Sequence, residues 1–311
     1  MKRRIVLAGG SGFIGSVLAE WLAAQDIDVV ILTRRPRAAT RIREVFWNGR
    51  ELGEWRNEID GAEAVINLAG RSVNCRYHAR NRSLIMNSRI DSTRVIGQAI
   101  GGCSHPPKVW LNSSTATIYR HTFGTAHDEA TGQIGGTPEA KDEFSVEVAV
   151  AWERELTNAQ TPATRKVALR SAMVLGRGAN SVLPNLLRLA RLGLGGTMGN
   201  GRQFVSWIHQ TDFCRAIDWL INHETFIGPV NIAAPNPLTN REMMAQAREC
   251  CGVRFGLPAP SWMLELGAFF LRTETELLIK SRRVVPGKLL HSGFEFEFPT
   301  FRRAIGLDRS L

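Results

Sequence analysis

Seven residues, Gly9–Gly15, contain four glycines, and they constrain the fold of this chain more than any other feature. A strand-like run, Arg4–Ala8, comes directly before them, and residues 13–24 follow with helical spacing. A glycine-rich turn between a strand and a helix is typical of a dinucleotide-binding βαβ unit. The basic and apolar start also resembles a secretory signal, but these glycines would interrupt the continuous apolar helix that a signal needs. The start of the chain therefore predicts a nucleotide-binding fold.

Each glycine of this turn has its own part in the prediction. Gly9 permits the tight turn, Gly12 lets the backbone approach a pyrophosphate, and Gly15 lets the helix lie close to the sheet. The free N–H groups at the helix start then face the anion. We expect cofactor contacts from the turn at Gly9, Ser11, Gly12, Phe13, Ile14 and Gly15.

Short apolar runs alternate with helical patterns over the first two thirds of the chain. The runs show no polar alternation, which is what strands buried on both faces of a parallel sheet require. We therefore predict an α/β fold with a Rossmann-type doubly wound parallel sheet. Strands are expected at 4–8, 29–33, 45–47, 64–69, 107–112, 166–170 and 230–233, and helices at 81–100 and 142–158.

Two arginines, Arg34 and Arg35, end the predicted second strand. A carboxylate at this place would bind a ribose 2′-hydroxyl and repel a 2′-phosphate, whereas two guanidinium groups suit NADP. The alternative is a pair of solvated loop arginines. We predict NADP, and NADPH in its reduced form, as the cofactor.

The regular alternation weakens after residue 170. Residues 204–209 resemble one strand, 211–223 a helix, and Thr239 with Glu242 forms a capping-box pattern at a helix start. Residues 262–278 are amphipathic, and an aromatic stripe follows that is more often core than ligand pocket. The stripe consists of Phe294, Phe296, Phe298 and Phe301.

These patterns predict two domains. An NADP-binding Rossmann domain is expected over 1–235, with substrate-domain insertions after about residue 171. A smaller C-terminal α+β substrate or cap domain is expected over 236–311, because Pro235 and Pro237 mark a boundary.

Composition limits the classes of partner. The net charge is +10, but the arginines are scattered along the chain, so nucleic-acid binding is not expected. No apolar stretch approaches the roughly 20 residues of a membrane-spanning helix. Five cysteines without a C-x-x-C pair suggest neither a metal site nor a disulfide framework, and we expect a cytoplasmic protein. The sequence leaves open whether the protein forms an oligomer.

Three segments give the chain a family resemblance: Gly9–Gly15, the Asn-Leu-Ala-Gly of 67–70, and the Ser-Ser-Thr-Ala-Thr-Ile-Tyr of 113–119. Together they resemble the extended short-chain dehydrogenase/reductases. Residues 88–89, 151–153, 193–201, 206–209 and 284–290 are similar to an atypical branch, the epimerase-family proteins with a C-terminal domain of unknown function. The resemblance implies a nicotinamide-binding fold. It also places Leu68, Ala69, Gly70 and Arg89 at the cofactor.

The parent family uses a Tyr-x-x-x-Lys pair, in which the lysine lowers the pKa of the tyrosine. This chain has two tyrosines, Tyr77 and Tyr119, and neither is followed by lysine four residues later. Alignment on Trp152 and Glu153 puts Ser145 at the tyrosine place and Ala149 at the lysine place. The family's acid–base pair is therefore absent.

Three residues stay as catalytic candidates. Thr115 matches the hydroxyl residue that contacts the substrate carbonyl in the family, and the alternative is a threonine that ends a buried strand. His209 is a potential proton donor with an ordinary pKa near 6.5, or a half-buried histidine with its bonds satisfied. Tyr119 has no lysine partner, so its pKa should stay near 10, and it would act as an acid and not as a base.

The predicted function is an NADP(H)-dependent oxidoreductase or epimerase acting on a small substrate. The alternative is a non-catalytic NADP(H)-sensing protein that acts through a protein partner. A basic stretch follows the fourth strand and consists of Arg71, Arg76, Arg80, Arg82 and Arg89. It is either a solvated helix face or a positively charged segment that attracts an anionic substrate or the cofactor phosphates. Val205 stands where nucleotide-sugar enzymes of the family have an arginine, so a nucleotide-sugar substrate is not expected.

Overall fold

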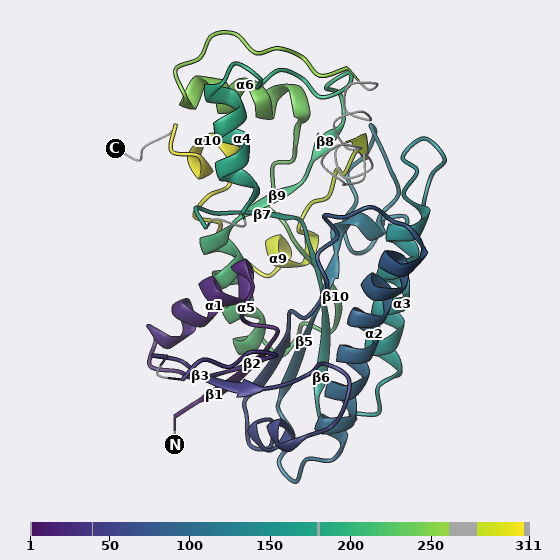
Figure 1. Ribbon diagram of the computed structural model, residues 1–311, viewed down its shortest axis with the longest axis vertical. Coiled ribbons are helices and arrows are strands. Elements are labelled where there is room, and N and C mark those ends of the chain that lie inside the picture. The colour runs from purple at the N-terminus through teal and green to yellow at the C-terminus, as the bar shows by residue number, and fades with distance from the viewer. Residues whose placement is uncertain (1, 39, 179–180, 261–278, 308–311) are drawn as a thin grey trace.

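The computed structural model describes residues 2–38, 40–178, 181–260 and 279–307. Figure 1 shows a central sheet with helices on both faces in the lower part of the molecule and a smaller helical lobe above it. The strands of the sheet point their carboxyl ends toward that lobe.

All seven strands of the sheet run parallel, in the order β3–β2–β1–β4–β5–β6–β10. This confirms the predicted doubly wound Rossmann-type sheet. The order reverses between β1 and β4, and the crevice outside the carboxyl ends at such a point is where ligands bind in these folds. The bounds are β1 (Arg4–Ala8), β2 (Asp28–Thr33), β3 (Arg43–Phe46), β4 (Ala64–Asn67), β5 (Val109–Thr115), β6 (Arg165–Ser171) and β10 (Gly228–Ile232).

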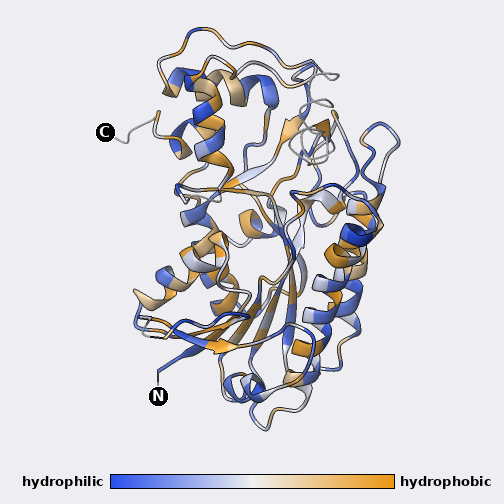
Figure 2. Cartoon of the chain, viewed as in Figure 1, coloured by the Kyte–Doolittle hydropathy of each residue, from blue (hydrophilic) through white to orange (hydrophobic). Residues whose placement is uncertain are grey.

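Helices cover both faces of the sheet. Helices α1 (Phe13–Ala23) and α5 (Gln210–Asn222) pack on one face, and α2 (Ala79–Gly101) and α3 (Glu143–Asn158) on the other. Successive residues of β1 point to opposite faces, so Leu7 joins the core beneath α1 and α5. Its neighbour Val6 joins the core beneath α2. Figure 2 shows the resulting hydrophobic colour along the strands.

The upper lobe has a separate core. It is formed by α4 (Val182–Arg191), α6 (Asn240–Cys250) and α10 (Phe301–Ala304), with Trp207 buried among them. The sequence patterns did not predict α4. The lobe thus combines residues from before and after position 235, and the predicted amphipathic segment 262–278 lies outside the described residues.

The single strand expected at 204–209 is two strands. Strand β8 (Phe204–Val205) pairs with β11 (Leu238–Thr239), and β9 (Trp207–His209) pairs with β7 (Met173–Leu175). The break falls at Ser206, whose hydroxyl donates to the carbonyl of Arg282 at 2.8 Å and accepts from the Val284 N–H at 2.8 Å. A contact with a distant part of the chain therefore interrupts the strand.

The C-terminal segment is attached to both parts of the molecule. Residues 280–284 lie beside β8 and β9 and lead into α9 (Gly287–His291), which packs on β10. Buried Asp212, at the start of α5, accepts the N–H groups of Glu297 and Phe298 at 2.8 Å each. Within the expected aromatic stripe, Phe294 and Phe301 are buried, as a core role predicts. The predicted capping box of Thr239 and Glu242 is present at α6.

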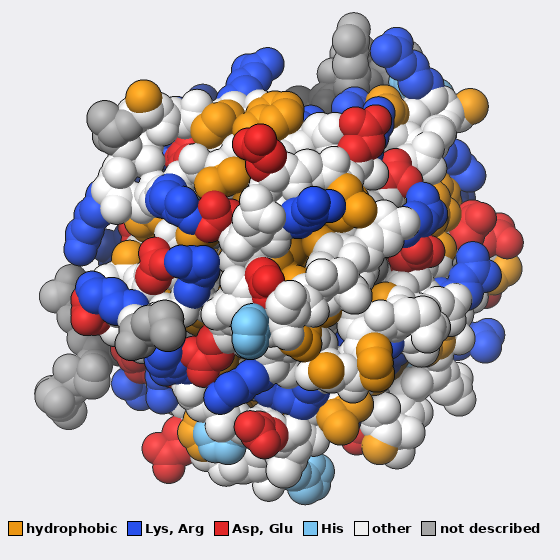
Figure 3. Space-filling view, turned by 90° about the horizontal axis from the view of Figure 1, so that it is seen from below, with side chains coloured by type: hydrophobic (Ala, Val, Ile, Leu, Met, Phe, Trp, Pro, Cys, Tyr) orange, Lys and Arg blue, Asp and Glu red, His pale blue; other side chains and the backbone are white. Residues whose placement is uncertain are grey.

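The face beneath the sheet, where the strands begin, carries charges of both signs. Figure 3 shows Lys and Arg intermixed with Asp and Glu on this face. Ion pairs such as Arg3–Glu63 and Arg4–Asp28 join the starts of neighbouring strands and loops there. Among the described residues no helix is long and apolar enough to cross a membrane.

Candidate functional site

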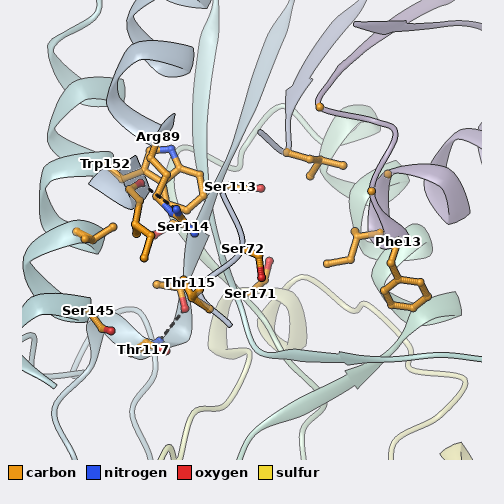
Figure 4. Close-up of a pocket in the computed structure, with 18 of the residues that line it drawn as sticks. Phe13, Ser72, Arg89, Ser113, Ser114, Thr115, Thr117, Ser145, Trp152 and Ser171 are labelled. Carbon is orange, nitrogen blue, oxygen red and sulfur yellow. Dashed lines mark hydrogen bonds between the residues drawn. The ribbon is translucent and has the colours of Figure 1, made fainter. Parts of the chain in front are cut away.

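A cavity of about 500 Å³ opens at the carboxyl ends of the strands, above the point where the strand order reverses. Figure 4 shows it between Phe13 on α1 and Trp152 on α3, with side chains from the end of β5 in between. Its lining comes from the glycine turn, the segment after β4, α2, the end of β5, α3 and the end of β6. The lining residues are Gly9, Gly12, Phe13, Ile14, Gly15, Leu68, Ser72, Val73, Tyr77, Ile85, Arg89, Ser113, Ser114, Thr115, Thr117, Phe144, Ser145, Val148, Trp152, Ser171 and Phe213.

Gly9, Gly12 and Gly15 differ in how much space surrounds them, as their predicted roles require. A Cβ on Gly9, whose φ is +74°, would lie 2.7 Å from the Cα of Ala69. A Cβ on Gly15 would lie 2.5 Å from the Cα of Gly10. Around Gly12 nothing lies within 4 Å of such an atom. The turn therefore packs tightly at both ends and leaves open space at its middle, which fits a pyrophosphate approaching the start of α1.

Of the remaining predicted cofactor residues, Leu68 and Arg89 line the cavity, whereas the others are not among its lining residues: Ser11, Arg34, Arg35, Ala69 and Gly70. Ala69 packs against Gly9, and Gly70 lies over the guanidinium of Arg89, so neither faces the cavity directly. Ser11 accepts a hydrogen bond from the Thr33 hydroxyl at 3.4 Å. Arg34 and Arg35 follow β2 and are exposed, and the structure gives their guanidinium groups no hydrogen bond or ion pair with another described residue. Their contact with a 2′-phosphate therefore stays a prediction.

Arg89 is a half-buried cation in the cavity wall. Its Nη1 donates to the carbonyls of Arg71 and Ile85 at 3.2 and 3.0 Å, and its guanidinium lies 5.0 Å from the centre of the Trp152 ring. Burial lowers the pKa of Arg89 to about 10. Among the described residues no carboxylate pairs with it, so this charge is available to an anionic ligand such as a phosphate group.

Hydroxyl groups form the part of the cavity nearest the end of β5. Thr115 is the last residue of β5, and its Oγ1 accepts the N–H of Thr117 at 3.1 Å as the cap of the 3₁₀ turn η2 (Ala116–Ile118). Thr117 lines the same cavity, and Ser145 approaches from the first turn of α3 (Figure 4). Thr115 therefore lines the cavity, and its contact with a substrate oxygen stays a prediction.

Tyr119 lies away from this cavity. It is 1% exposed, and its hydroxyl accepts from Nη1 of Arg170 and donates to Oδ1 of Asn231, each at 2.9 Å. Burial raises its pKa. The tyrosine is not among the residues that line the cavity, and its hydroxyl donates to Asn231, so the structure gives no support to the predicted role as a proton donor to a ligand there.

His209 does not line the cavity either. It caps the start of α5, where its Nδ1 accepts the Thr211 N–H at 3.2 Å, and its ring lies 3.9 Å from the ring of Phe298. Burial lowers its pKa below the usual 6.5. These contacts match the alternative of a satisfied, half-buried histidine.

Residues 5–233 match the model of the NAD dependent epimerase/dehydratase family, and residues 259–306 match a domain of unknown function, DUF1731. The chain belongs to the NAD dependent epimerase/dehydratase family. This confirms the resemblance that the sequence motifs indicated.

Relatives and solved structures match over nearly the whole length of this family member. It is 32% identical to an epimerase family protein of Mycobacterium leprae over 308 residues, which cover 98% of this chain and 95% of the relative. It is 29% identical to the human epimerase family protein SDR39U1 over 307 residues, or 97% and 98% of the two chains. The crystal structure of that human protein (isoform 2) with NADPH covers 97% of each chain with a TM-score of 0.83 and 28% identity.

In this epimerase-family chain, the expected tyrosine and lysine places have different surroundings. Ser145 faces the cavity (Figure 4). Ala149 is fully buried in a small core with Tyr119 and Val284, so apolar packing fills the lysine place. Of the described residues that line the cavity, Tyr77 and Arg89 are the ones with titratable side chains.

An apolar wall formed by α3, on the same side of the cavity as Ser145, was not predicted from the sequence. Phe144, Val148 and Trp152 line it from α3, and Tyr77 packs against Phe144 with ring centres 5.1 Å apart. Ser145, Val148 and Trp152 are spaced by three and four residues, so they share one helix face. That spacing could have identified the wall once Ser145 was placed at the cofactor.

Proposed function

We propose that this chain binds NADPH along the cavity and reduces a small carbonyl compound beside Thr115. The single observation that carries the proposal is the continuity of the cavity from the glycine turn to the hydroxyl groups at the end of β5. One ligand can therefore contact the helix start and the predicted catalytic threonine together. The human relative crystallised with NADPH supports the same choice of cofactor.

The residues present fit a dinucleotide. The open space at Gly12 and the N–H groups at the start of α1 would hold the pyrophosphate, and Arg89 would neutralise part of its charge. Arg34 and Arg35 would hold the 2′-phosphate. When bound, the cofactor supplies a hydride to the carbonyl carbon, the carbonyl π electrons move onto the oxygen, and a proton from water completes the alcohol.

The chain contributes orientation and electrostatic stabilisation to this reaction. Thr115 donates a hydrogen bond toward the substrate oxygen, and the apolar wall around Phe144 and Trp152 excludes water from that side of the cavity. Arg71 is exposed and directly precedes the lining residue Ser72 in the chain, and its positive charge favours an anionic substrate.

Calorimetry with NADPH and NADH, followed by NADPH oxidation against aldehydes, ketones, keto acids and nucleotide sugars, tests the proposal. We expect micromolar binding of NADPH, weaker binding of NADH, and turnover with one of the non-nucleotide carbonyl classes.

Arg89→Met should weaken NADPH binding tenfold or more, because a hydrogen bond to a charged group contributes about 1.5–3 kcal/mol. Arg94→Met is the matched control, because Arg94 lies on the same helix and pairs with Asp91 and Glu155. Absence of NADPH binding would contradict the proposal.

A sensing function is the second candidate. It is favoured by Ser145 and Ala149, which leave the family's acid–base positions without titratable groups. Partner recovery from cell extract with and without NADPH distinguishes the two functions. A partner that depends on NADPH, together with no turnover in the carbonyl panel, would favour sensing.

A further inference from the structure

The hydroxyl groups of the cavity have fixed hydrogen-bond directions. A hydroxyl has one proton and two acceptor lone pairs, so its partners decide what it can offer to a ligand. A backbone N–H or a guanidinium N–H can only donate, and an ionised carboxylate can only accept. The hydrogen-bond partners of Ser114, Thr115 and Thr117 are groups of these kinds, which either only donate or only accept.

Ser114 presents acceptor lone pairs. Its Oγ lies 2.6 Å from Oε1 of Glu153, and that carboxylate is held by Arg170 through Nε at 2.8 Å and Nη2 at 2.7 Å. The Glu153 oxygens accept the N–H groups of Arg170, and Oε1 also accepts the hydroxyl proton of Ser114. A ligand group beside Ser114 must therefore donate, as an amide N–H or a hydroxyl does.

Thr115 and Thr117 present protons. The oxygen of Thr115 accepts the Thr117 N–H, and the oxygen of Thr117 accepts Nε–H of Arg282, each at 3.1 Å. Neither hydroxyl donates to another described residue. Their protons are therefore available to a ligand oxygen in the cavity.

The C-terminal segment holds Thr117 from behind. Besides the bond from Arg282, the buried ammonium of Lys280 donates to the Thr117 carbonyl at 2.6 Å and pairs with the carboxylate of buried Asp142. A hydrogen bond from a charged donor is stronger than a neutral one and polarises the hydroxyl that accepts it. Thr117 is thus fixed in orientation and is a stronger donor than an isolated threonine.

We propose that Thr115 and Thr117 form a donor pair for the reacting oxygen of the substrate, and that Arg282 is a positioning residue that acts through Thr117. The inference rests on the proposed carbonyl reduction, and it adds a second donor and a positioning residue to the contact proposed at Thr115. The substrate is a carbonyl compound whose oxygen accepts from both threonines. Two donors aimed at the same oxygen stabilise the negative charge that develops there.

Binding of cyclohexanone to the NADP⁺-saturated protein tests this inference without turnover, because the oxidised cofactor has no hydride to give. Calorimetry should show binding of cyclohexanone and not of methylenecyclohexane, which has the same shape without the oxygen. Thr117→Val should weaken cyclohexanone binding about fivefold to tenfold, as expected for one lost hydrogen bond, and Thr117→Ser should retain it.

Arg282 and its neighbour Arg283 allow a matched test of the proposed positioning role of Arg282. Arg282→Gln should weaken cyclohexanone binding severalfold, and Arg282→Lys should recover part of it, with NADP⁺ affinity unchanged in both. Arg283→Gln should have no effect, because Arg283 contacts the Gly124 carbonyl and the Phe204 ring instead.

The outcomes separate the two proposals. If NADP⁺ does not bind to the unmodified protein, the proposed function fails. If NADP⁺ binds but cyclohexanone does not, or if Thr117→Val and Arg282→Gln both bind it as the unmodified protein does, the donor pair is overturned and cofactor binding stands. Thermal melting of each variant identifies any loss of fold, in which case Thr117→Ser against Thr117→Ala repeats the comparison.

Discussion

Arg170 donates a hydrogen bond to the Tyr119 hydroxyl at 2.9 Å, and this contact fixes the role of the tyrosine. The same guanidinium holds both carboxylate oxygens of Glu153, and the tyrosine hydroxyl donates a hydrogen bond to Oδ1 of Asn231. Although burial opposes the charge of Arg170, the bonds to Glu153 raise its pKa. The network joins the floor of the cavity, through Ser114 and Glu153, to the core beneath the C-terminal segment.

Tyr119→Phe should therefore reduce stability and leave NADPH binding unchanged. Removal of the hydroxyl leaves Arg170 and Asn231 each without one buried partner, which costs about 1–3 kcal/mol. Urea unfolding measures the loss and calorimetry measures the binding. A variant of unchanged stability that had lost turnover would instead return Tyr119 to the catalytic site.

Two substitutions in the glycine turn should have different effects. Gly12→Ala places a methyl group in open space, so stability should change by less than about 0.5 kcal/mol, while NADPH binding should weaken at least tenfold because the methyl group occupies the pyrophosphate path. Gly15→Ala meets the backbone of Gly10 and should cost about 1–3 kcal/mol of stability. Melting curves and calorimetry on both variants test this. Equal NADPH affinity in Gly12→Ala and the unmodified protein would contradict a pyrophosphate at the turn.

Preference for NADPH over NADH should depend on the arginines after β2. Arg34→Ser and Arg35→Ser should each lower NADPH affinity, with a combined loss of about tenfold to a hundredfold, and leave NADH affinity unchanged. Arg37→Ser is the control, because Arg37 pairs with Glu44 and lies three residues beyond Arg34. If NADPH and NADH affinities fall together, the arginines do not recognise the 2′-phosphate.

Acid should destabilise the protein partly through His209. Burial keeps the pKa of His209 below the usual 6.5, so below about pH 6.5 the unfolded chain binds a proton that the folded chain does not. Stability therefore falls as pH decreases below that value, by up to about 1.4 kcal/mol per pH unit for one group. His209→Asn keeps a capping side chain and cannot titrate, so unfolding measured from pH 7.5 to 5.5 should depend less on pH. Burial also lowers the pKa of His121, so part of the pH dependence of the unfolding free energy should remain in this variant. An unchanged slope would contradict this assignment.

Local patterns were sufficient for the sheet and for the glycine turn. The runs around β1, β2 and β5 are apolar on both sides because both faces are covered, and periodicity shows this directly. The pattern could not predict α4, because α4 packs against α6 much further along the chain. It could not predict the break at Ser206 either, because that break depends on residues 76 and 78 positions away. Tyr119 and His209 were candidates because of their chemistry, whereas their availability depends on burial, which the sequence does not give.

The sequence by itself determined the parallel Rossmann-type sheet, the turn that fits a pyrophosphate and the absence of the Tyr-x-x-x-Lys pair, because each follows from residues close together in the chain. Tertiary structure alone decided which hydroxyl groups share the cavity and which way their protons point. That decision comes from Glu153 behind Ser114 and from Arg282 behind Thr117, and the second of these partners is 165 residues away. Hydrogen-bond direction is a property of partners brought together by folding, so no local pattern specifies it.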